Sequence, residues 1–133
     1  MIMRIILFLL LMGTVHQMLA QDNNSPEALA QRQLDAYNIQ DLDAFLACYH
    51  DSVRVYNFPD QLRYVGKEKM EKTYGPFFEN TPDLHCELVN RIVEGNTVID
   101  HEKVTVNKNQ PPFNAIAIYK IKEGKIAEVY FTQ

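Results

Sequence analysis

Two acidic residues occupy positions where a strand pattern calls for apolar ones. In the segment 97–107, Val98 and Val104 share one face of a strand, because side chains alternate between the two faces. Asp100 and Glu102 have the same parity, so both are predicted to point inward, roughly 7 Å apart along the strand. Burial and a like-charged neighbour raise the pKa of a carboxyl group toward neutrality. We therefore hypothesise that Asp100 and Glu102 are catalytic acid–base groups.

The same two residues also permit an interpretation without catalysis. If the sheet bulges here, the carboxylates reach solvent or pair with Lys103, Arg91 or Lys120. The sequence alone leaves both interpretations open. Neither includes a metal ion, because His85 and His101 have the opposite parity, and no cofactor is expected.

Four tyrosines, Tyr37, Tyr49, Tyr74 and Tyr119, are predicted to point inward by helix or strand spacing. Aromatic residues at such positions usually belong to the core, although a few polar tips in an apolar wall also suit a small-molecule pocket. Asn57 stands at the end of a predicted strand. Its amide either hydrogen-bonds a ligand carbonyl or caps the strand.

Three helices are predicted to position these residues. A Ser-Pro-Glu start indicates a helix over 25–38. A second, shorter helix is predicted to begin at Asp41, with Tyr49 on its apolar stripe. A third is predicted over 67–78, with a break or kink at Pro76.

Alternation and tight turns predict strands over 52–58, 84–93, 97–107, 113–122 and 125–132. The short links between the last four strands require antiparallel neighbours, so the fold class is α+β. In the strand 84–93, parity places Cys86, Leu88 and Ile92 inward and Arg91 outward.

Residues 1–20 are predicted to be a signal peptide, because one basic residue precedes an apolar run too short to span a membrane. A linker over 21–24 and one domain over 25–133 would follow. The chain is therefore expected to be exported. Its two cysteines, Cys48 and Cys86, are expected to be buried free thiols rather than a disulfide. The net charge of −4 indicates that the chain does not bind nucleic acid.

The outward-facing residues Asn114, Ile116 and Ile118 form a largely apolar strip on the outer sheet face. Exposed isoleucines on a sheet normally need covering. We expect a homodimer through this face, although the chain's own terminus is an alternative cover.

Three segments together resemble the nuclear transport factor 2-like superfamily, which includes ketosteroid isomerases and SnoaL-like polyketide cyclases. They are QDLDAFLACYHDSVRVYNFP, GKEKMEKTY from Gly66, and IYKIKEGKIAEVYF from Ile118. The resemblance implies a cone-shaped, cystatin-like roll in which three N-terminal helices pack inside a curved antiparallel sheet around an apolar pocket. The residues expected to line this pocket are Gln33, Tyr37, Tyr49, Asn57, Tyr74, Ala117, Tyr119 and Val129.

The catalytic residues of the ketosteroid isomerases do not carry over. By the resemblance, the general base of that branch falls on Asn57, and its two oxyanion-hole residues fall on Gln33 and Ala117. An amide does not shuttle protons, so steroid isomerase activity is not expected. Two hypotheses remain. The first is a cofactor-free enzyme that acts on a small apolar carbonyl compound, and the second is a non-catalytic ligand-binding or assembly domain.

Overall fold

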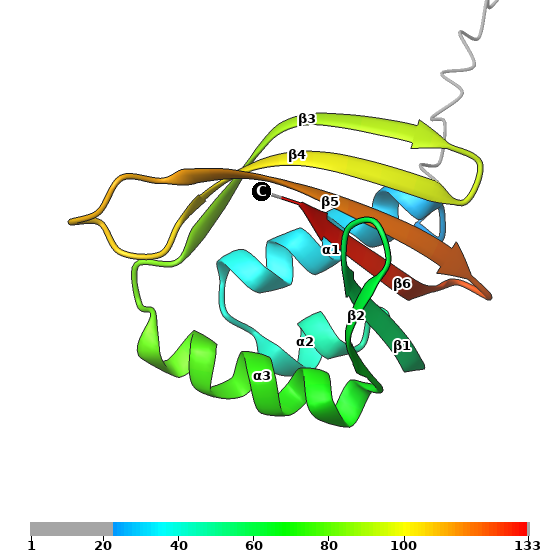
Figure 1. The fold of residues 1–133 in the computed structure, drawn as a ribbon, viewed down its shortest axis with the longest axis horizontal. Helices are drawn as coiled ribbons and strands as arrows, with labels where there is room; N and C mark the ends of the chain where they lie inside the picture. Colours follow the sequence, from blue (N-terminus) through cyan, green and yellow to red (C-terminus); the bar gives the residue numbers. More distant parts are fainter. Residues whose placement is uncertain (1–22, 133) are drawn as a thin grey trace, which may run out of the picture.

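The computed structural model describes residues 23–132, which form three helices and one six-stranded sheet (Figure 1). The helices are α1 (Pro26–Asn38), α2 (Leu42–Leu46) and α3 (Lys67–Asn80). The strands are β1 (Tyr49–Asn57), β2 (Gln61–Val65), β3 (His85–Glu94), β4 (Thr97–Thr105), β5 (Phe113–Lys122) and β6 (Lys125–Thr132). The leader predicted for residues 1–20 lies outside the described residues, as does the first half of the linker.

The sheet curves over the helices, so the predicted α+β roll is confirmed (Figure 1). Its strand order is β2-β1-β6-β5-β4-β3. All neighbouring strands are antiparallel except β1 and β6, which run parallel. This parallel pair brings the first strand of the chain against its last described strand.

Strand β2 was not predicted, and β1 begins earlier than expected. The predicted second helix includes Tyr49, but α2 ends at Leu46 and Tyr49 pairs with Ile126 of β6. The Ile126 amide also donates to the Cys48 carbonyl at 2.9 Å. The helix stops because this pairing with a distant strand takes the backbone groups that another helical turn would use.

The break expected at Pro76 is absent, because α3 continues through the proline to Asn80. Two side chains hold its last turn. Gln40 Nε2 donates to the Phe78 carbonyl at 2.9 Å, and Thr81 Oγ1 donates to the Phe77 carbonyl at 2.5 Å. These bonds satisfy carbonyl groups that a helix end otherwise leaves unpaired.

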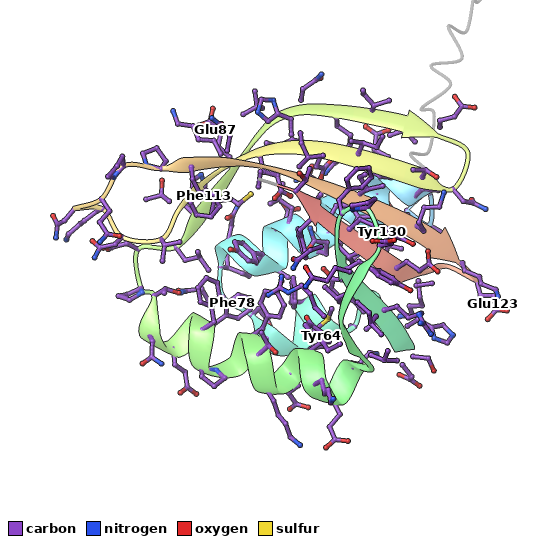
Figure 2. The ribbon with its side chains drawn as sticks, in the orientation of Figure 1. Tyr64, Phe78, Glu87, Phe113, Glu123 and Tyr130 are labelled. Atoms are coloured by element: carbon purple, nitrogen blue, oxygen red, sulfur yellow. The ribbon has the colours of Figure 1, made fainter. Side chains whose placement is uncertain are left out.

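The core lies between the concave face of the sheet and the helices. Phe78 points from α3 into this space, whereas Glu87 points away from the sheet on the opposite side (Figure 2). Cys48 and Cys86 are buried as separate free thiols. None of the described helices is long and apolar enough to cross a membrane.

Candidate functional site

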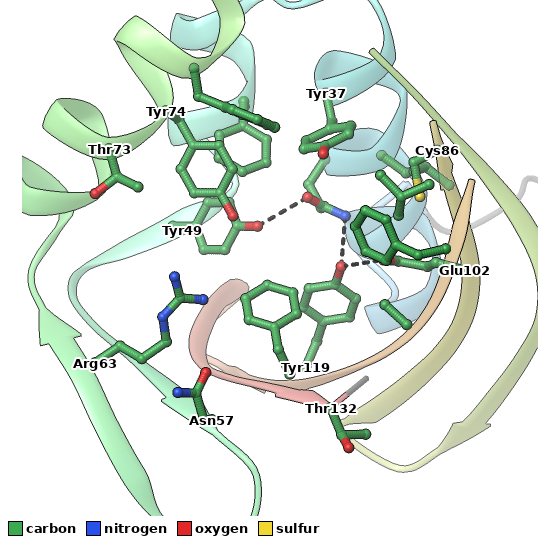
Figure 3. A pocket seen from close by; sticks show the side chains of 18 of the residues that line it. Tyr37, Tyr49, Asn57, Arg63, Thr73, Tyr74, Cys86, Glu102, Tyr119 and Thr132 are labelled. Carbon is green, nitrogen blue, oxygen red and sulfur yellow. Dashed lines mark hydrogen bonds between the residues drawn. The ribbon is translucent and has the colours of Figure 1, made fainter. Parts of the chain in front are cut away.

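A cavity of about 710 Å³ opens between the helices and the concave sheet face (Figure 3). This volume lies in the range of small-molecule sites, roughly 300–1,000 Å³. The exposed residues of its wall are Asn57, Phe58, Arg63, Thr73 and Phe113, and they mark the mouth. The buried residues of its wall are Gln33, Leu34, Phe45, Tyr49, Cys86, Glu102, Val104, Ala115 and Tyr119. Tyr37, Tyr74, Phe77, Phe131 and Thr132 lie between the two groups.

Four buried side chains form one directional hydrogen-bond chain at the floor of the cavity (Figure 3). Tyr49 donates its hydroxyl to Gln33 Oε1 at 3.0 Å. Gln33 Nε2 donates to the Tyr119 oxygen at 3.0 Å, and the Tyr119 hydroxyl donates to Glu102 Oε1 at 3.3 Å. Every donor points toward Glu102, so the chain ends on a carboxylate oxygen that serves as an acceptor.

The environment of Glu102 raises the pKa of its carboxyl group to about 7. Burial is the main cause, and the charge of Asp100 is the second. Hydrogen bonds from Tyr119 and Cys86 and the charge of Arg91 act in the opposite direction. A carboxyl group with a pKa near neutral pH can both accept and return a proton, which is the requirement for acid–base catalysis.

Asp100 is fully buried but does not line the cavity. Arg91 of β3 donates to both of its carboxylate oxygens, at 2.7 and 2.8 Å, and also donates to Gln31 Oε1 of α1 at 3.0 Å. The inward orientation predicted for Asp100 is therefore correct, while its direct place in the pocket is not supported. The pairing with Arg91 was one of the two interpretations left open by the sequence.

The outward orientation predicted for Arg91 is wrong, and a β-bulge is the reason. Leu88 pairs with Glu102 and Asn90 pairs with His101, so Val89 is an extra residue in β3. Beyond the bulge the parity is reversed. The Arg91 side chain is only 8% exposed, whereas Ile92, expected inside, is 56% exposed.

Tyr37 and Tyr74 differ from the other two cavity tyrosines. Their rings pack edge to face, with centroids 6.4 Å apart, and burial raises the pKa of both hydroxyls, so both remain neutral donors. Neither hydroxyl forms a hydrogen bond within the described residues. Every fully buried side-chain N or O atom among the described residues has a hydrogen-bond partner, so neither hydroxyl is completely enclosed. Because both residues line the cavity, their hydroxyls are candidate donors to a ligand.

Of the predicted pocket residues, the structure brings Gln33, Tyr37, Tyr49, Asn57, Tyr74 and Tyr119 together around the cavity, with Glu102. Ala117 and Val129 do not belong to its wall. Both are fully buried within the sheet, where Ala117 lies opposite Asp100 and Phe131, and Val129 lies opposite Tyr119. Among the residues that sequence reasoning missed are Arg63, Thr73 and Phe113.

A profile of the SnoaL-like domain matches residues 30–129. A cystatin-fold protein of Novosphingobium aromaticivorans is similar, with 26% identity, a TM-score of 0.74, and 82% of this chain and 98% of that one covered. A proposed polyketide cyclase of Sinorhizobium meliloti has 19% identity and a TM-score of 0.68, covering 84% and 99%. A SnoaL-like protein of Burkholderia thailandensis has 20% identity and a TM-score of 0.67, covering 80% and 92%. No match was found among curated proteins.

Proposed function

The chain belongs to the SnoaL-like family of nuclear transport factor 2-like domains, and from the site described above we propose that it is a cofactor-independent acid–base enzyme. The substrate class is a small, largely apolar carbonyl compound. The observation that carries the proposal is Glu102, a carboxyl group with a pKa of about 7 at the floor of the cavity. Perturbed carboxyl groups in a concave apolar site are candidates for catalysis.

In the proposed reaction, the Glu102 carboxylate removes a proton from the carbon next to the substrate carbonyl. The electron pair of the broken C–H bond forms a C=C bond to the carbonyl carbon, and the π pair of the carbonyl group moves to its oxygen, which gives an enolate. The Tyr37 and Tyr74 hydroxyls supply hydrogen bonds to a ligand oxygen, which lowers the energy of this anion. When the enolate is conjugated with a second C=C bond, Glu102 returns the proton to the far carbon of that system, so an isomerisation needs no further reactant.

The roles of the remaining residues follow from their contacts. Tyr119 orients the Glu102 carboxylate, and Gln33 and Tyr49 hold Tyr119 in turn. Asp100 and Arg91 touch neither the cavity nor a ligand within it. Their charges act on the pKa of Glu102 in opposite directions, since Asp100 raises it and Arg91 lowers it.

Proton abstraction can be tested without the natural substrate. In D₂O, 2-tetralone, an apolar ketone with acidic α-hydrogens, should exchange these hydrogens faster with the protein than in buffer alone. The exchange rate should rise with pH around an apparent pKa near 7. Glu102→Gln should reduce the protein-dependent rate by about 100-fold or more. Proton NMR of the α-position provides the measurement.

The matched control is Glu87→Gln, which alters an exposed carboxylate on the outer side of the neighbouring strand and should leave the exchange rate unchanged. Exchange at the buffer rate, or exchange that survives Glu102→Gln, would contradict the enzymatic proposal.

A non-catalytic ligand-binding domain is the second candidate function. The positions implied to carry ketosteroid isomerase chemistry support it. Asn57 is exposed at the mouth and its amide donates to Gln61 Oε1 at 3.1 Å, while Ala117 is sealed in the sheet. In this case 2-tetralone would bind with no acceleration of exchange.

We also propose a homodimer formed through the outer sheet face. One apolar residue from each strand lies in a cross-strand row, and neighbours in this row pair directly in register. The row, called here the outer row, consists of Ile92, Ile99, Ile118, Tyr130, Tyr56 and Leu62. The two tyrosine rings stack with centroids 4.6 Å apart. A continuous apolar surface of this kind is typical of a protein interface.

Export after cleavage near Ala20 remains a proposal that rests on the composition of residues 1–20. Expression of the full chain in a bacterial host, followed by N-terminal sequencing of the protein in the periplasm and medium, tests it. A mature protein that retains Met1 inside the cell would refute it.

A further inference from the structure

Arg63 owes its place at the mouth of the cavity to a β-bulge. Val55 pairs with Tyr64 and Tyr56 pairs with Leu62, so Arg63 is an extra residue of β2 without a partner on β1. Bulges redirect side chains and are common next to functional sites. Figure 3 shows the Arg63 side chain extending from β2 into the cavity, where it lies on the side opposite to Glu102.

The guanidinium group of Arg63 has no carboxylate partner within residues 23–132. The ion pairs in that range join Lys67 to Asp51, Lys72 to Glu68 and Arg91 to Asp100. Arg63 also donates no hydrogen bond there. Its charge reaches the cavity wall, because it opposes the rise in the pKa of both Tyr64 and Tyr74. Arg63 is thus a positive charge at the cavity wall whose donors have no partner among the described residues.

The two charged side chains of the cavity wall stand at opposite ends. Glu102 is 7% exposed at the floor, and Arg63 is exposed at the mouth. A ligand with one negative charge is repelled by the carboxylate and attracted by the guanidinium group. Its charged end therefore belongs at the mouth, and its uncharged body belongs against the aromatic residues Tyr37, Tyr74 and Phe77.

We propose that the ligand of this cavity is an amphipathic carboxylate whose carboxylate group binds Arg63. The proposal rests on the function proposed above and narrows its substrate class to carbonyl compounds that carry a carboxylate away from the reacting carbon. A planar guanidinium group fits a carboxylate through two parallel hydrogen bonds. One arginine, without a second basic residue in the described cavity wall, matches a monoanion rather than a phosphate dianion.

The test compares 4-phenylbutanoate with 4-phenylbutanamide, which has nearly the same shape and no charge. Calorimetric titration of the wild type should give about 10-fold tighter binding of the carboxylate, because charge-assisted hydrogen bonds are stronger than neutral ones. Arg63→Gln should remove this preference and leave the affinity for the amide unchanged. The preference should also weaken as salt is added.

Arg54→Gln is the matched control, because Arg54 is an exposed arginine on β1 that donates to the Tyr56 hydroxyl and does not line the cavity. It should retain the preference. The proposal is overturned if the wild type does not bind the carboxylate more tightly than the amide, or if Arg63→Gln keeps the preference.

The two proposals can fail separately. A carboxylate preference that depends on Arg63, without any α-hydrogen exchange of 2-tetralone, would leave the Arg63 site standing and remove the catalytic role of Glu102. Exchange that depends on Glu102, without a carboxylate preference, would support the catalytic role of Glu102 and remove the proposed carboxylate site at Arg63.

Discussion

Arg91 binds Asp100 through two parallel hydrogen bonds, from Nε to Oδ1 at 2.7 Å and from Nη2 to Oδ2 at 2.8 Å. This pairing separates the roles of the two inward carboxylates of β4. Asp100 is fixed by its partner and is remote from the cavity, whereas Glu102 has no basic partner and borders the cavity. The negative charge of Asp100 nevertheless raises the pKa of Glu102. Asp100 thus changes the pKa of Glu102 without lining the cavity.

Removing one member of the Arg91–Asp100 pair should lower the free energy of unfolding far more than removing both. Asp100→Leu alone leaves a guanidinium group buried without a carboxylate, which costs about 3–5 kcal/mol of folding free energy. The double variant Arg91→Met/Asp100→Leu leaves no unpaired charge and should recover most of this loss. Urea denaturation of the wild type, both single variants and the double variant measures the coupling.

Equal losses of stability in the single and double variants would show that the ion pair is not the source of the effect.

Asp100→Leu should also change the pKa of Glu102. In Asp100→Leu the pKa of Glu102 should fall, because a like charge has been removed. Carbon-13 NMR of the Glu102 carboxyl group provides this measurement.

The stability of the protein should depend on pH through Glu102. Its pKa is about 7 in the folded protein and 4.5 without the protein environment, so the folded state holds the proton more tightly. The stabilising contribution of the neutral carboxyl group is complete below pH 4.5 and is lost as the pH rises to 7. Glu102→Gln should therefore gain stability relative to the wild type over this window, by about 3 kcal/mol at most.

Denaturation of wild type and Glu102→Gln between pH 4 and 8 measures this difference, with Glu87→Gln as the exposed control. A difference between wild type and Glu102→Gln that stays constant with pH would contradict the raised pKa.

Removal of the Tyr119 hydroxyl should mainly lower the stability of the fold, whereas removal of the Tyr74 hydroxyl should mainly weaken ligand binding. Tyr119→Phe leaves Gln33 Nε2 without an acceptor and removes one of the two donors to Glu102, which should cost about 1–3 kcal/mol and raise the pKa of Glu102 further. Tyr74→Phe removes a hydroxyl that has no partner in the described residues, so its stability should change by less than about 0.5 kcal/mol.

In binding experiments Tyr74→Phe, which hardly changes stability, should have the clearer effect. Tyr74→Phe should weaken the binding of 2-tetralone, because its carbonyl oxygen loses a donor. Unchanged affinity in Tyr74→Phe would show that this hydroxyl does not face the ligand.

The proposed dimer should depend on the outer row. Ile118→Lys places a charge in the middle of this row and should convert dimers to monomers in sedimentation equilibrium. Asn80→Lys changes an exposed residue at the end of helix α3, away from the outer sheet face, and should leave the dimer intact. A wild-type protein that remains monomeric at high concentration would end the proposal.

Local patterns predict most of the fold. Alternation and turn residues locate β3 to β6, and the inward parity of Asp100 and Glu102 is correct because β4 itself is regular across both residues. The helix start at Ser25 is also correct, since its hydroxyl accepts from the Ala28 amide at 3.1 Å. These features depend on residues a few positions apart, which sequence reasoning can compare directly.

The two arginines that shape the site escape such reasoning for a common reason. Arg91 is turned inward by the bulge at Val89, and Arg63 is itself the extra residue of a bulge in β2. A bulge is defined by the register between two strands, and the sequence of one strand does not reveal that register. Strand β2 is missed altogether, because it is only five residues long and its bulge breaks the register: Leu62 pairs with Tyr56 of the outer face and Tyr64 pairs with the buried Val55.

Strand β6 lies between β1 and β5, although it is translated after every other described element. Asn57 of β1 pairs with Phe131 of β6, so β1 and β6 can pair only after Phe131 has been synthesised. Pairing across so much of the chain is a slow step in folding. Phe131 and Thr132 also form part of the cavity wall. The cavity therefore lacks part of its wall until β6 has paired with β1 and β5.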